Sequence, residues 1–197
     1  MNSKIRSPRL RGMSLVETLV VVAILAILAT LALLAYEGVV SKSRDVKCLS
    51  NLRSLVQGTQ LYISDNDGRL PYLGTNGQER WWHRRVYTYL TPNDYYQFPK
   101  DAEDIFLCPE DKSPVGGKVS YGFNKRLAGL RQQQIEHNVI FIADADSTDL
   151  TGNGGNVYDF RADHNGRGNV AMKDGSIVKY AEIPPPSEQI DLWYSPN

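Results

Sequence analysis

Acidic side chains gather in the last third of the sequence, where they could supply oxygen ligands to a hard cation such as Ca²⁺. The segment from 144 to 174 carries these aspartates and one histidine: Asp144, Asp146, Asp149, Asp159, Asp163, His164 and Asp174. Aspartates in a stretch rich in Gly and Asn also initiate turns and keep a long loop solvated. The segment therefore leaves a cation site and a plain surface loop as alternatives.

The histidine in this segment is the natural candidate for catalysis. His164 stands beside Asp163 and could act as a general base or as a metal ligand. The sequence offers no nucleophile in a recognised elbow, no HExxH motif and no paired-cysteine metal motif. We therefore expect no enzyme, and we expect His164 to fix the loop that enters a following hairpin by hydrogen bonding.

The two cysteines, Cys48 and Cys108, are too few for a disulfide-dense scaffold or a four-cysteine zinc site. Both follow the apolar N-terminal segment described next, so we expect both to face an oxidising compartment. A bridge would tether the loop around Cys108 to the helix that carries Cys48, and would contribute about 2–4 kcal/mol. Because the sequence does not establish that they are close, a disulfide and two separate thiols stand as alternatives.

The N-terminal segment has the charge and hydropathy pattern of a membrane helix. Residues 1–12 carry four basic side chains and no acidic one, and residues 19–35 form an apolar run interrupted only by Thr30. With Leu15 and Val16 added, this run is just long enough to cross a hydrocarbon core of about 30 Å. The basic residues predict that the N-terminus stays cytoplasmic and that the rest of the chain is exported.

The composition as a whole excludes several classes of protein. The length of 197 residues suits one ordinary domain with an appendage. The 22 basic and 22 acidic residues give a formal net charge of zero, which argues against a dedicated nucleic-acid binder. A mean hydropathy of -0.36 excludes a membrane protein with many spans.

Two simple interpretations of the apolar run do not account for all of its features. A cleaved signal peptide has an apolar core of about 7–15 residues, shorter than this one. A plain membrane anchor fits except for Glu17, because a carboxylate in the hydrocarbon region is unfavourable unless it is paired. Glu17 is therefore a candidate functional residue.

The residues around it, Arg11-Gly12-Met13-Ser14-Leu15-Val16-Glu17, followed by a helix of Val, Ala, Ile and Leu, resemble the processing and methylation site of type IV prepilins and pseudopilins. The resemblance implies that a membrane aspartyl peptidase cuts between Gly12 and Met13. It also implies that Met13 is then N-methylated and that Glu17 matches the glutamate at the fifth mature position of the family. Met13 departs from the commoner Phe at the first mature position, a change that the family tolerates.

The resemblance gives Glu17 a physical role. Cleavage creates an ammonium at Met13, and methylation leaves it cationic. If subunits stack with their apolar helices in a filament core, Glu17 of one subunit can neutralise the Met13 ammonium of a neighbour. An unpaired carboxylate is costly in that core, whereas a matched pair specifies register. We therefore expect Glu17 to select the axial register during assembly.

A second resemblance involves His164 and the pair Asp174-Gly175. Nine residues separate His164 from Asp174, which resembles the H-x9-DG element of a prepilin-associated domain family. Other fragments fit that family in order: Cys48-Leu49-Ser50-Asn51-Leu52-Arg53, Asp65-Asn66-Asp67-Gly68-Arg69-Leu70-Pro71, Leu107-Cys108-Pro109-Glu110-Asp111 and Ser120-Tyr121-Gly122-Phe123-Asn124.

This family is similar to the G-type pseudopilins of type II secretion. The resemblance implies an α+β, pilin-like fold in which a long N-terminal helix, transmembrane in its first half, packs on a small antiparallel β-sheet. G-type pseudopilins generally hold calcium in a C-terminal loop, so it also implies a possible structural Ca²⁺, with Asp144, Asp146 and Asp163 as its ligands. No cofactor is expected to be required.

The periodicity of the chain predicts where its elements lie. Apolar residues from Val46 to Ile63 recur every three to four positions, which predicts that the N-terminal helix continues to the turn at Asp65-Asn66-Asp67-Gly68. The two-residue loop Asp174-Gly175 suits a type I′ hairpin turn. The predicted elements are a helix over 14–65, a short helix within 79–90, strands at 118–123 and 138–143, and a hairpin of 169–173 with 176–180.

We therefore expect four segments: a cleaved basic leader at 1–12, a transmembrane helix at 13–40, an exported pilin-like domain at 41–183, and an extended Pro-rich tail at 184–197. The resemblance implies a subunit of a type II secretion pseudopilus or a type IV pilus-like filament. It would sit in the inner membrane with a cytoplasmic N-terminus and a periplasmic domain.

The expected partners follow from the same resemblance. They are the prepilin peptidase and methyltransferase, other pilin or pseudopilin subunits, the inner-membrane assembly platform and membrane lipid, but not nucleic acid. The alternative is a membrane-anchored exported module for adhesion or sugar binding that does not polymerise. Trp81 and Trp82 could stack on a sugar, although such residues more often pack in the core or at the rim of a small sheet.

Overall fold

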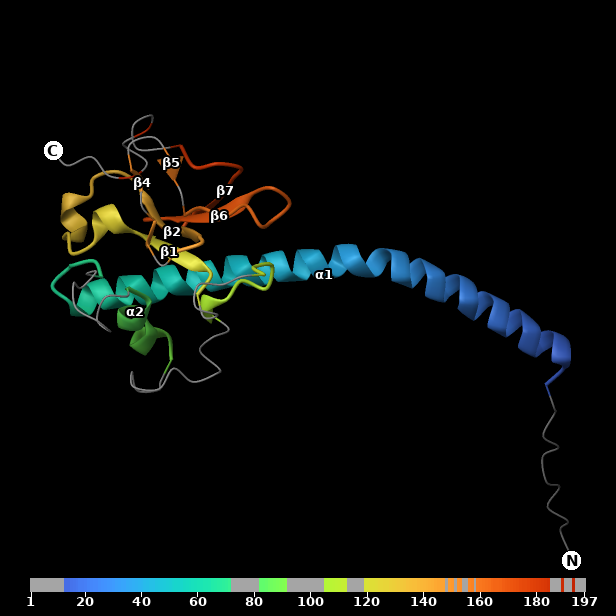
Figure 1. Ribbon diagram of the computed structural model, residues 1–197. Coiled ribbons are helices and arrows are strands. Elements are labelled where there is room, and N and C mark those ends of the chain that lie inside the picture. The colour runs from blue at the N-terminus through green and yellow to red at the C-terminus, as the bar shows by residue number, and fades with distance from the viewer. Residues whose placement is uncertain are drawn as a thin grey trace, which may run out of the picture. The chain divides into compact units, whose positions relative to one another are not determined.

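The computed structural model describes residues 13–71, 82–91, 105–112, 119–147, 149–150, 152–153, 156–157 and 159–184, together with Gln189 and Trp193. The chain divides into two compact units, Met1–Ser41 and Lys42–Asn197, which are described one at a time below. A long N-terminal helix and a small, mainly antiparallel sheet give the α+β layout that was predicted (Figure 1).

Helix α1, Leu15–Asp65, is 51 residues long and confirms the helix predicted over 14–65. Its last turn is closed by the N–H of Gly68, which donates to the carbonyl oxygen of Ile63 over 3.0 Å. Asp67 and Gly68 have φ angles of 54° and 74°, the left-handed conformation that stops an α-helix. The predicted turn cluster therefore ends the helix where the sequence placed it.

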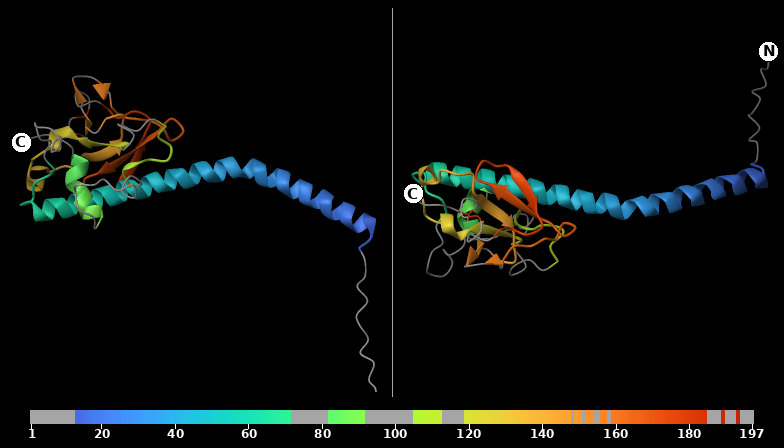
Figure 2. Two further views of the ribbon diagram at one scale, coloured as in Figure 1. Left: turned by 60° about the horizontal axis from the view of Figure 1, so that its bottom comes forward. Right: turned by 90° about the horizontal axis from the view of Figure 1, so that it is seen from above.

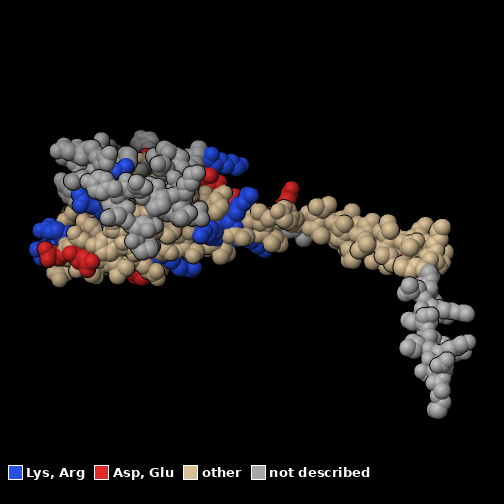
Figure 3. All heavy atoms as spheres, turned by 90° about the horizontal axis from the view of Figure 1, so that it is seen from below, with Lys and Arg blue, Asp and Glu red and all other residues tan. Residues whose placement is uncertain are grey.

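In the first unit, α1 exposes its apolar side chains. Leu15 and Leu33 are 79% and 72% exposed, for example. The helix is long and apolar enough to cross a membrane, and Figure 3 shows this section as a surface with almost no charge. Contiguous apolar surface of this kind is unfavourable in water and indicates contact with lipid or with other apolar helices.

In the second unit, one face of α1 is buried in the core. Cys48 is the first buried residue along the described side chains of the helix. The buried side chains recur every three to four residues, as one face of a helix requires; they include Cys48, Leu52, Leu55, Val56, Thr59, Tyr62 and Ile63. This face therefore anchors the helix on the sheet and on α2.

The main sheet has five strands in the order β3-β1-β2-β6-β7. Neighbouring strands are antiparallel except for the short edge strand β3, which runs parallel to β1. Figure 2 shows the sheet lying along the second half of α1. Its strands are β1 (Tyr121–Asn124), β2 (Ile140–Asp144), β3 (Asp149–Leu150), β6 (Gly168–Met172) and β7 (Ile177–Tyr180). A separate pair is formed by β4 (Gly152–Asn153) and β5 (Asn156–Val157).

The β6–β7 hairpin lies where it was predicted, but its turn is of a different type. The N–H of Gly175 donates to the carbonyl oxygen of Met172 over 2.9 Å, and the N–H of Met172 donates to the carbonyl oxygen of Ser176 over 2.8 Å. Gly175 has a φ of 85°, whereas Asp174 is not in the left-handed region. A type I′ turn needs two residues of positive φ, so the prediction of that turn is wrong. The loop has three residues, and only its glycine needs the left-handed conformation.

Two apolar clusters form the core, and β2 contributes to both. The larger cluster joins Phe141 of β2 to α1 and to α2 (Trp82–Leu90). Helix α2 confirms the short helix predicted within 79–90, as far as those residues are described. The smaller cluster contains Ile140 of β2 and the fully buried Trp193. Because apolar side chains pack from both directions, β2 and β6 are buried at every position.

Trp193 shows that the expectation of an extended tail does not hold at this position. Its Nε1–H donates to the carbonyl oxygen of Pro184 over 2.7 Å, and its own carbonyl accepts from Nδ2 of Asn124 over 2.9 Å. Burial of a tryptophan side chain is strongly favourable when its N–H finds an acceptor. The chain therefore returns to the core after the proline run.

Candidate functional site

The first candidate site is the start of α1. Met13 is 66% exposed and precedes the first helical residue, Leu15, by two positions. Gly12 and the basic leader lie outside the described residues. Met13, which follows the predicted cleavage point, precedes the helix and is not part of its hydrogen-bonded turns.

Glu17 lies in the first turn of α1 and caps it. The backbone N–H of Ser14 donates to Oε2 of Glu17 over 2.8 Å. This is the glutamate half of a capping box, in which an acidic side chain satisfies an N–H that the helix leaves unpaired. A carboxylate here also interacts favourably with the positive end of the helix dipole. This interaction was not predicted, although the Ser-x-x-Glu spacing of Ser14 and Glu17 is its sequence signature.

The second candidate site lies in the second unit, where a disulfide joins Cys48 of α1 to Cys108. Their Cα atoms are 5.0 Å apart, and 60 positions separate them in the sequence. Next to the bridge, Nδ2 of Asn51 donates to the carbonyl oxygen of Leu107 over 2.8 Å, which holds the loop against the helix. Of the two alternatives that the sequence left open, the structure has the bridge.

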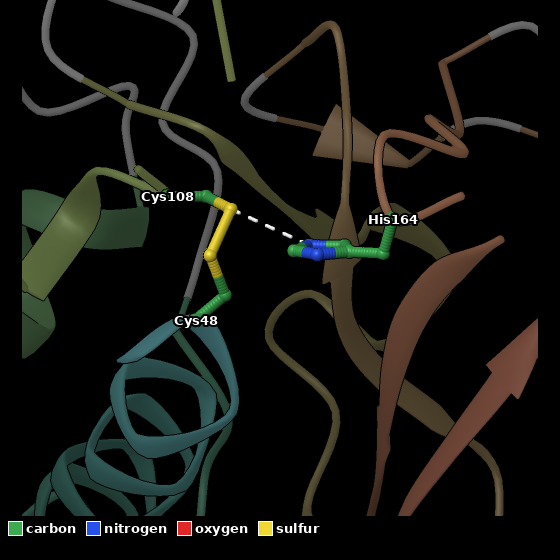
Figure 4. Close-up of side chains that lie close together, drawn as sticks. All are labelled: Cys48, Cys108 and His164. Atoms are coloured by element: carbon green, nitrogen blue, oxygen red, sulfur yellow. Dashed lines mark hydrogen bonds between the residues drawn. A yellow bond between two sulfur atoms is a disulfide. The ribbon is translucent and has the colours of Figure 1, made fainter. Parts of the chain in front are cut away.

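His164 lies against this disulfide (Figure 4), and a carboxylate lies near each of its ring nitrogens. Its Nε2 is 3.4 Å from Sγ of Cys108 and 3.2 Å from Oδ2 of Asp144. Its Nδ1 is 3.1 Å from Oδ1 of Asp45, whose other oxygen pairs with Lys179 of β7. The imidazole therefore connects α1, the Cys108 loop and β2.

The protonation of His164 reflects this environment. Burial alone lowers the pKa of an imidazole, because it disfavours the charged form. Here the hydrogen bond and charge of Asp144, together with the charge of Asp45, outweigh burial and the opposing charge of Lys179, so the pKa of His164 is raised. A protonated ring can donate to a carboxylate from each nitrogen.

Asp144 is held by a second partner as well as by His164. Its Oδ2 accepts from the backbone N–H of Asn169 over 2.7 Å and from Nδ2 of Asn169 over 3.0 Å. These bonds join β2 to β6 in the interior. The expected role of His164 in fixing the loop before the hairpin is consistent with this network. At the backbone, the N–H of His164 donates to the carbonyl oxygen of Arg167 over 2.8 Å.

The two ends of the H-x9-DG element have separate partners. Oδ1 of Asp174 accepts from the N–H of Ser176 over 2.8 Å and from its hydroxyl over 2.6 Å. These bonds lower the pKa of Asp174. Gly175 supplies the left-handed position of the same turn. The Asp-Gly pair therefore shapes the hairpin, whereas the histidine belongs to the disulfide site.

The three predicted calcium ligands are divided between two networks. Asp146 and Asp163 each lie 3.0 Å from Nε of Arg161, which also pairs with Asp111, whereas Asp144 is committed to His164 and Asn169. Among the described residues, these aspartates do not form a close set of metal-ligating atoms.

The pKa of the Asp163 carboxyl is raised above its ordinary value. Burial raises the pKa of Asp163, and although Arg161 opposes this, the charges of Asp111 and Asp144 add to it. The charge of His164 opposes the rise as that of Arg161 does, so acidic and basic neighbours act on this carboxyl in opposite directions. Arg161 was not considered in the sequence analysis, and no local signal identifies it as the centre of the group.

The close group of metal-ligating side chains within the described residues is Cys48, Cys108 and His164. All three are buried, and their ligand atoms lie within 4.8 Å of one another. Trp82 is not available to stack on a sugar, because it is fully buried and packs against Phe106 and Phe123. Its neighbour Trp81 lies outside the described residues.

Comparison with known proteins identifies the N-terminal segment. The family model for the prokaryotic N-terminal methylation motif matches residues 8–33, which include Gly12, Met13, Glu17 and most of the apolar run. No curated protein and no solved structure matches the chain. The match supports a prepilin-like, type IV pilin-like protein, and it bears on the N-terminal resemblance alone.

Proposed function

We propose that the chain is the precursor of a subunit of a type II secretion pseudopilus or a type IV pilus-like filament. The observation that carries the proposal is the methylation motif at 8–33 on a helix whose apolar side chains are exposed. A prepilin peptidase would cut between Gly12 and Met13, and the new amino group of Met13 would be methylated. The mature helix would then hold the subunit in the inner membrane until assembly.

The charge of the chain fits this sequence of events. The leader contains four of the 22 basic residues and none of the acidic ones, so its removal makes the neutral precursor acidic. Basic residues ahead of a span favour a cytoplasmic N-terminus, and with that orientation the second unit would lie in the periplasm. The same compartment is oxidising, as the disulfide between Cys48 and Cys108 requires.

Glu17 would change partner during assembly. In the precursor its carboxylate accepts from the N–H of Ser14 in the same chain. After cleavage, the ammonium of Met13 in a neighbouring subunit is a stronger partner, because a charged donor binds a carboxylate more tightly than an amide does. The pair would be strengthened further in an apolar filament core, where the dielectric is low.

The experiment is mass spectrometry of the N-terminus after the chain is made with a prepilin peptidase, using a catalytically inactive peptidase as the matched control. We expect a chain that begins at methylated Met13 with the active enzyme and an intact leader with the inactive one. An unprocessed chain in both samples would contradict the proposal and favour the anchored binding module. Filaments recovered with a cognate assembly system would then separate a subunit from a processed protein that does not polymerise.

A further inference from the structure

Three side chains that commonly bind soft metals meet at the disulfide of the second unit. Cys48 comes from α1, Cys108 from the loop that follows Phe106, and His164 from the segment before β6. Their exposed fractions are 0%, 4% and 7%, so the cluster is closed to bulk water. Figure 4 shows the imidazole edge facing the sulfur of Cys108.

The spacing of these atoms suits a tetrahedral metal site. Zinc bonds of about 2.3 Å to sulfur and about 2.0 Å to nitrogen place the two ligand atoms about 3.5 Å apart. In the structure, Nε2 of His164 lies 3.4 Å from Sγ of Cys108. This edge of the tetrahedron is therefore already formed before any metal is present.

The second sulfur would have to move to complete such a site. In a tetrahedral site two thiolates lie about 3.8 Å apart, given zinc–sulfur bonds of about 2.3 Å. The Cα atoms of Cys48 and Cys108 are 5.0 Å apart. Once the S–S bond is broken, rotation about the side-chain torsions of the two cysteines would have to bring the sulfurs to this spacing beside His164.

The surroundings also supply the outer groups of a metal site. A ligating histidine generally presents its other ring nitrogen to a carboxylate, which fixes the ring and raises its basicity. Asp45 occupies this place, with Oδ1 at 3.1 Å from Nδ1 of His164. Asp144 lies 3.2 Å from Nε2 and is held by Asn169. It would lose its contact with Nε2 when that nitrogen binds a metal, and it could then accept from a water in the fourth direction.

We propose that the reduced chain binds one divalent cation of the zinc type through Cys48, Cys108 and His164, and that formation of the disulfide closes this site. The chain is synthesised with both thiols reduced, so the metal form precedes the disulfide form. The proposal does not depend on the function proposed above, since it rests on the second unit alone.

The chemistry balances in both directions. Binding of M²⁺ releases one proton from each thiol to water and, from a protonated ring, the proton on Nε2 of His164, since the imidazole binds through an unprotonated Nε2. Oxidation by an external disulfide forms the S–S bond between Cys48 and Cys108 and releases the cation. The two electrons of the thiolate pair pass to the oxidant, whose two sulfurs leave as thiolates and take up two protons from water. Because the S–S bond removes both thiolates, metal and disulfide exclude each other.

The test is a cobalt(II) titration of the full chain in detergent, kept without oxygen after reduction by a phosphine. Cobalt replaces zinc in such sites and reports thiolate ligands by a charge-transfer band and tetrahedral geometry by its ligand-field bands. We expect both signals at one cobalt per reduced chain, displacement by zinc, and neither signal from the oxidised chain. A reduced chain without the charge-transfer band would overturn the proposal.

Variants test the histidine, and each is first checked for an intact disulfide before reduction, which reports a correct fold. His164→Asn should weaken cobalt binding by at least about 10-fold, whereas its matched control His137→Asn, at an exposed histidine, should bind as the wild type does. If His164→Asn binds cobalt with unchanged affinity and spectrum, the proposal is overturned.

Asp45 is a positioning residue in this proposal, and its variant gives a graded effect. Asp45→Asn should keep the tetrahedral thiolate spectrum but lower the affinity by about 10–100-fold, as is typical of changes behind a ligating histidine. The matched control is Asp65→Asn, an exposed aspartate at the other end of the same helix. Equal affinities for the two variants would overturn the role given to Asp45.

Discussion

Oδ1 of Asp45 lies 3.1 Å from Nδ1 of His164, so a residue near the start of the packed section of α1 faces an imidazole from the segment before β6. The same ring faces Asp144 of β2 from its other nitrogen. Two carboxylates about one imidazole favour its charged form, since opposite charges within a few ångströms stabilise each other. This relationship gives His164 a pKa above the ordinary value of about 6.5.

The first prediction concerns that titration in the oxidised chain kept in chelator. Asp45→Asn should lower the pKa of His164 relative to the wild type, because one of the two favourable charges is removed. Since the folded pKa is raised, His164 stabilises the fold fully below about pH 6.5 and loses this contribution as pH rises through the folded value. NMR of the imidazole measures the pKa directly. An unchanged value in the variant would show that Asp45 does not act on the ring.

A second prediction concerns the disulfide. Removing a cross-link that closes a loop of 60 residues should lower the free energy of unfolding by about 4 kcal/mol, through the greater freedom of the unfolded chain. Thermal unfolding of the full chain in detergent, with and without reductant and in the presence of chelator, measures the loss. The double variant Cys48→Ala/Cys108→Ala is the control, because its melting temperature should not respond to reductant. A wild-type melting temperature that likewise does not change with reductant would contradict the prediction.

A third prediction concerns assembly. Glu17→Leu should leave cleavage after Gly12 and membrane insertion largely intact but should abolish incorporation into filaments, because the Met13 ammonium of the neighbour loses its partner. The matched control is Glu37→Leu, at an exposed glutamate farther along α1, which should assemble normally. Immunoblots of sheared filaments and of membranes separate incorporation from insertion. Normal incorporation of Glu17→Leu would show that Glu17 does not select the axial register.

A fourth prediction concerns Gly168 in β6. A Cβ at this position would lie 1.9 Å from the carbonyl oxygen of Arg161 and 2.5 Å from the ring of Phe160. Gly168→Ala should therefore destabilise the second unit by about 1–3 kcal/mol, the range for overpacking. The control Val178→Ala, at a partly exposed site on the paired strand, should change stability by less than about 1 kcal/mol. Equal melting temperatures for the two variants would show that the backbone yields at Gly168.

A fifth prediction concerns pH and His83. Burial, with a smaller contribution from Arg84, lowers the pKa of His83 to about 3. Below about pH 6.5 the imidazole of His83 binds a proton in the unfolded chain but stays neutral in the folded chain. As the pH falls from 6 to 4, His83 therefore lowers the free energy of unfolding by about 1.4 kcal/mol per pH unit. His83→Gln should flatten this part of the profile, and the exposed His137→Gln should not. Urea unfolding followed by tryptophan fluorescence at several pH values measures the slope. A steep profile in His83→Gln would assign the effect to other groups.

Local patterns predicted the elements of the fold well. The N-terminal motif with its apolar run gave the start of α1, and the Asp-Asn-Asp-Gly turn gave its end, each within one residue, because an apolar helix and a left-handed stop are encoded in neighbouring positions. The β6–β7 hairpin was found for the same reason. Its turn type was not, since Asp174-Gly175 fits both a two-residue loop and the three-residue loop in which only Gly175 takes positive φ.

Features that depend on distant segments could not be predicted. Nothing near Cys48 or Cys108 in the sequence reports that their Cα atoms lie 5.0 Å apart. The aspartates suggested a shared cation, but the fold gives Asp146 and Asp163 a cation of the protein itself, Arg161. Trp193 likewise reaches the core by a contact with Asn124 across 69 positions, beyond a proline run that favours extended chain.

The place of the disulfide on α1 has a mechanical consequence. Cys48 is the first buried side chain among the described residues of the helix, so a pull that peels the helix from the sheet from its N-terminal side meets a covalent bond before it meets the packed core. The load then passes to the Cys108 loop and, through the bond from the N–H of Ser120 to the carbonyl oxygen of Phe106, to the start of β1. In the oxidised chain, tension along the helix would therefore reach β1 through a covalent bond, whereas in the reduced chain it would act directly on the packed apolar face of the helix.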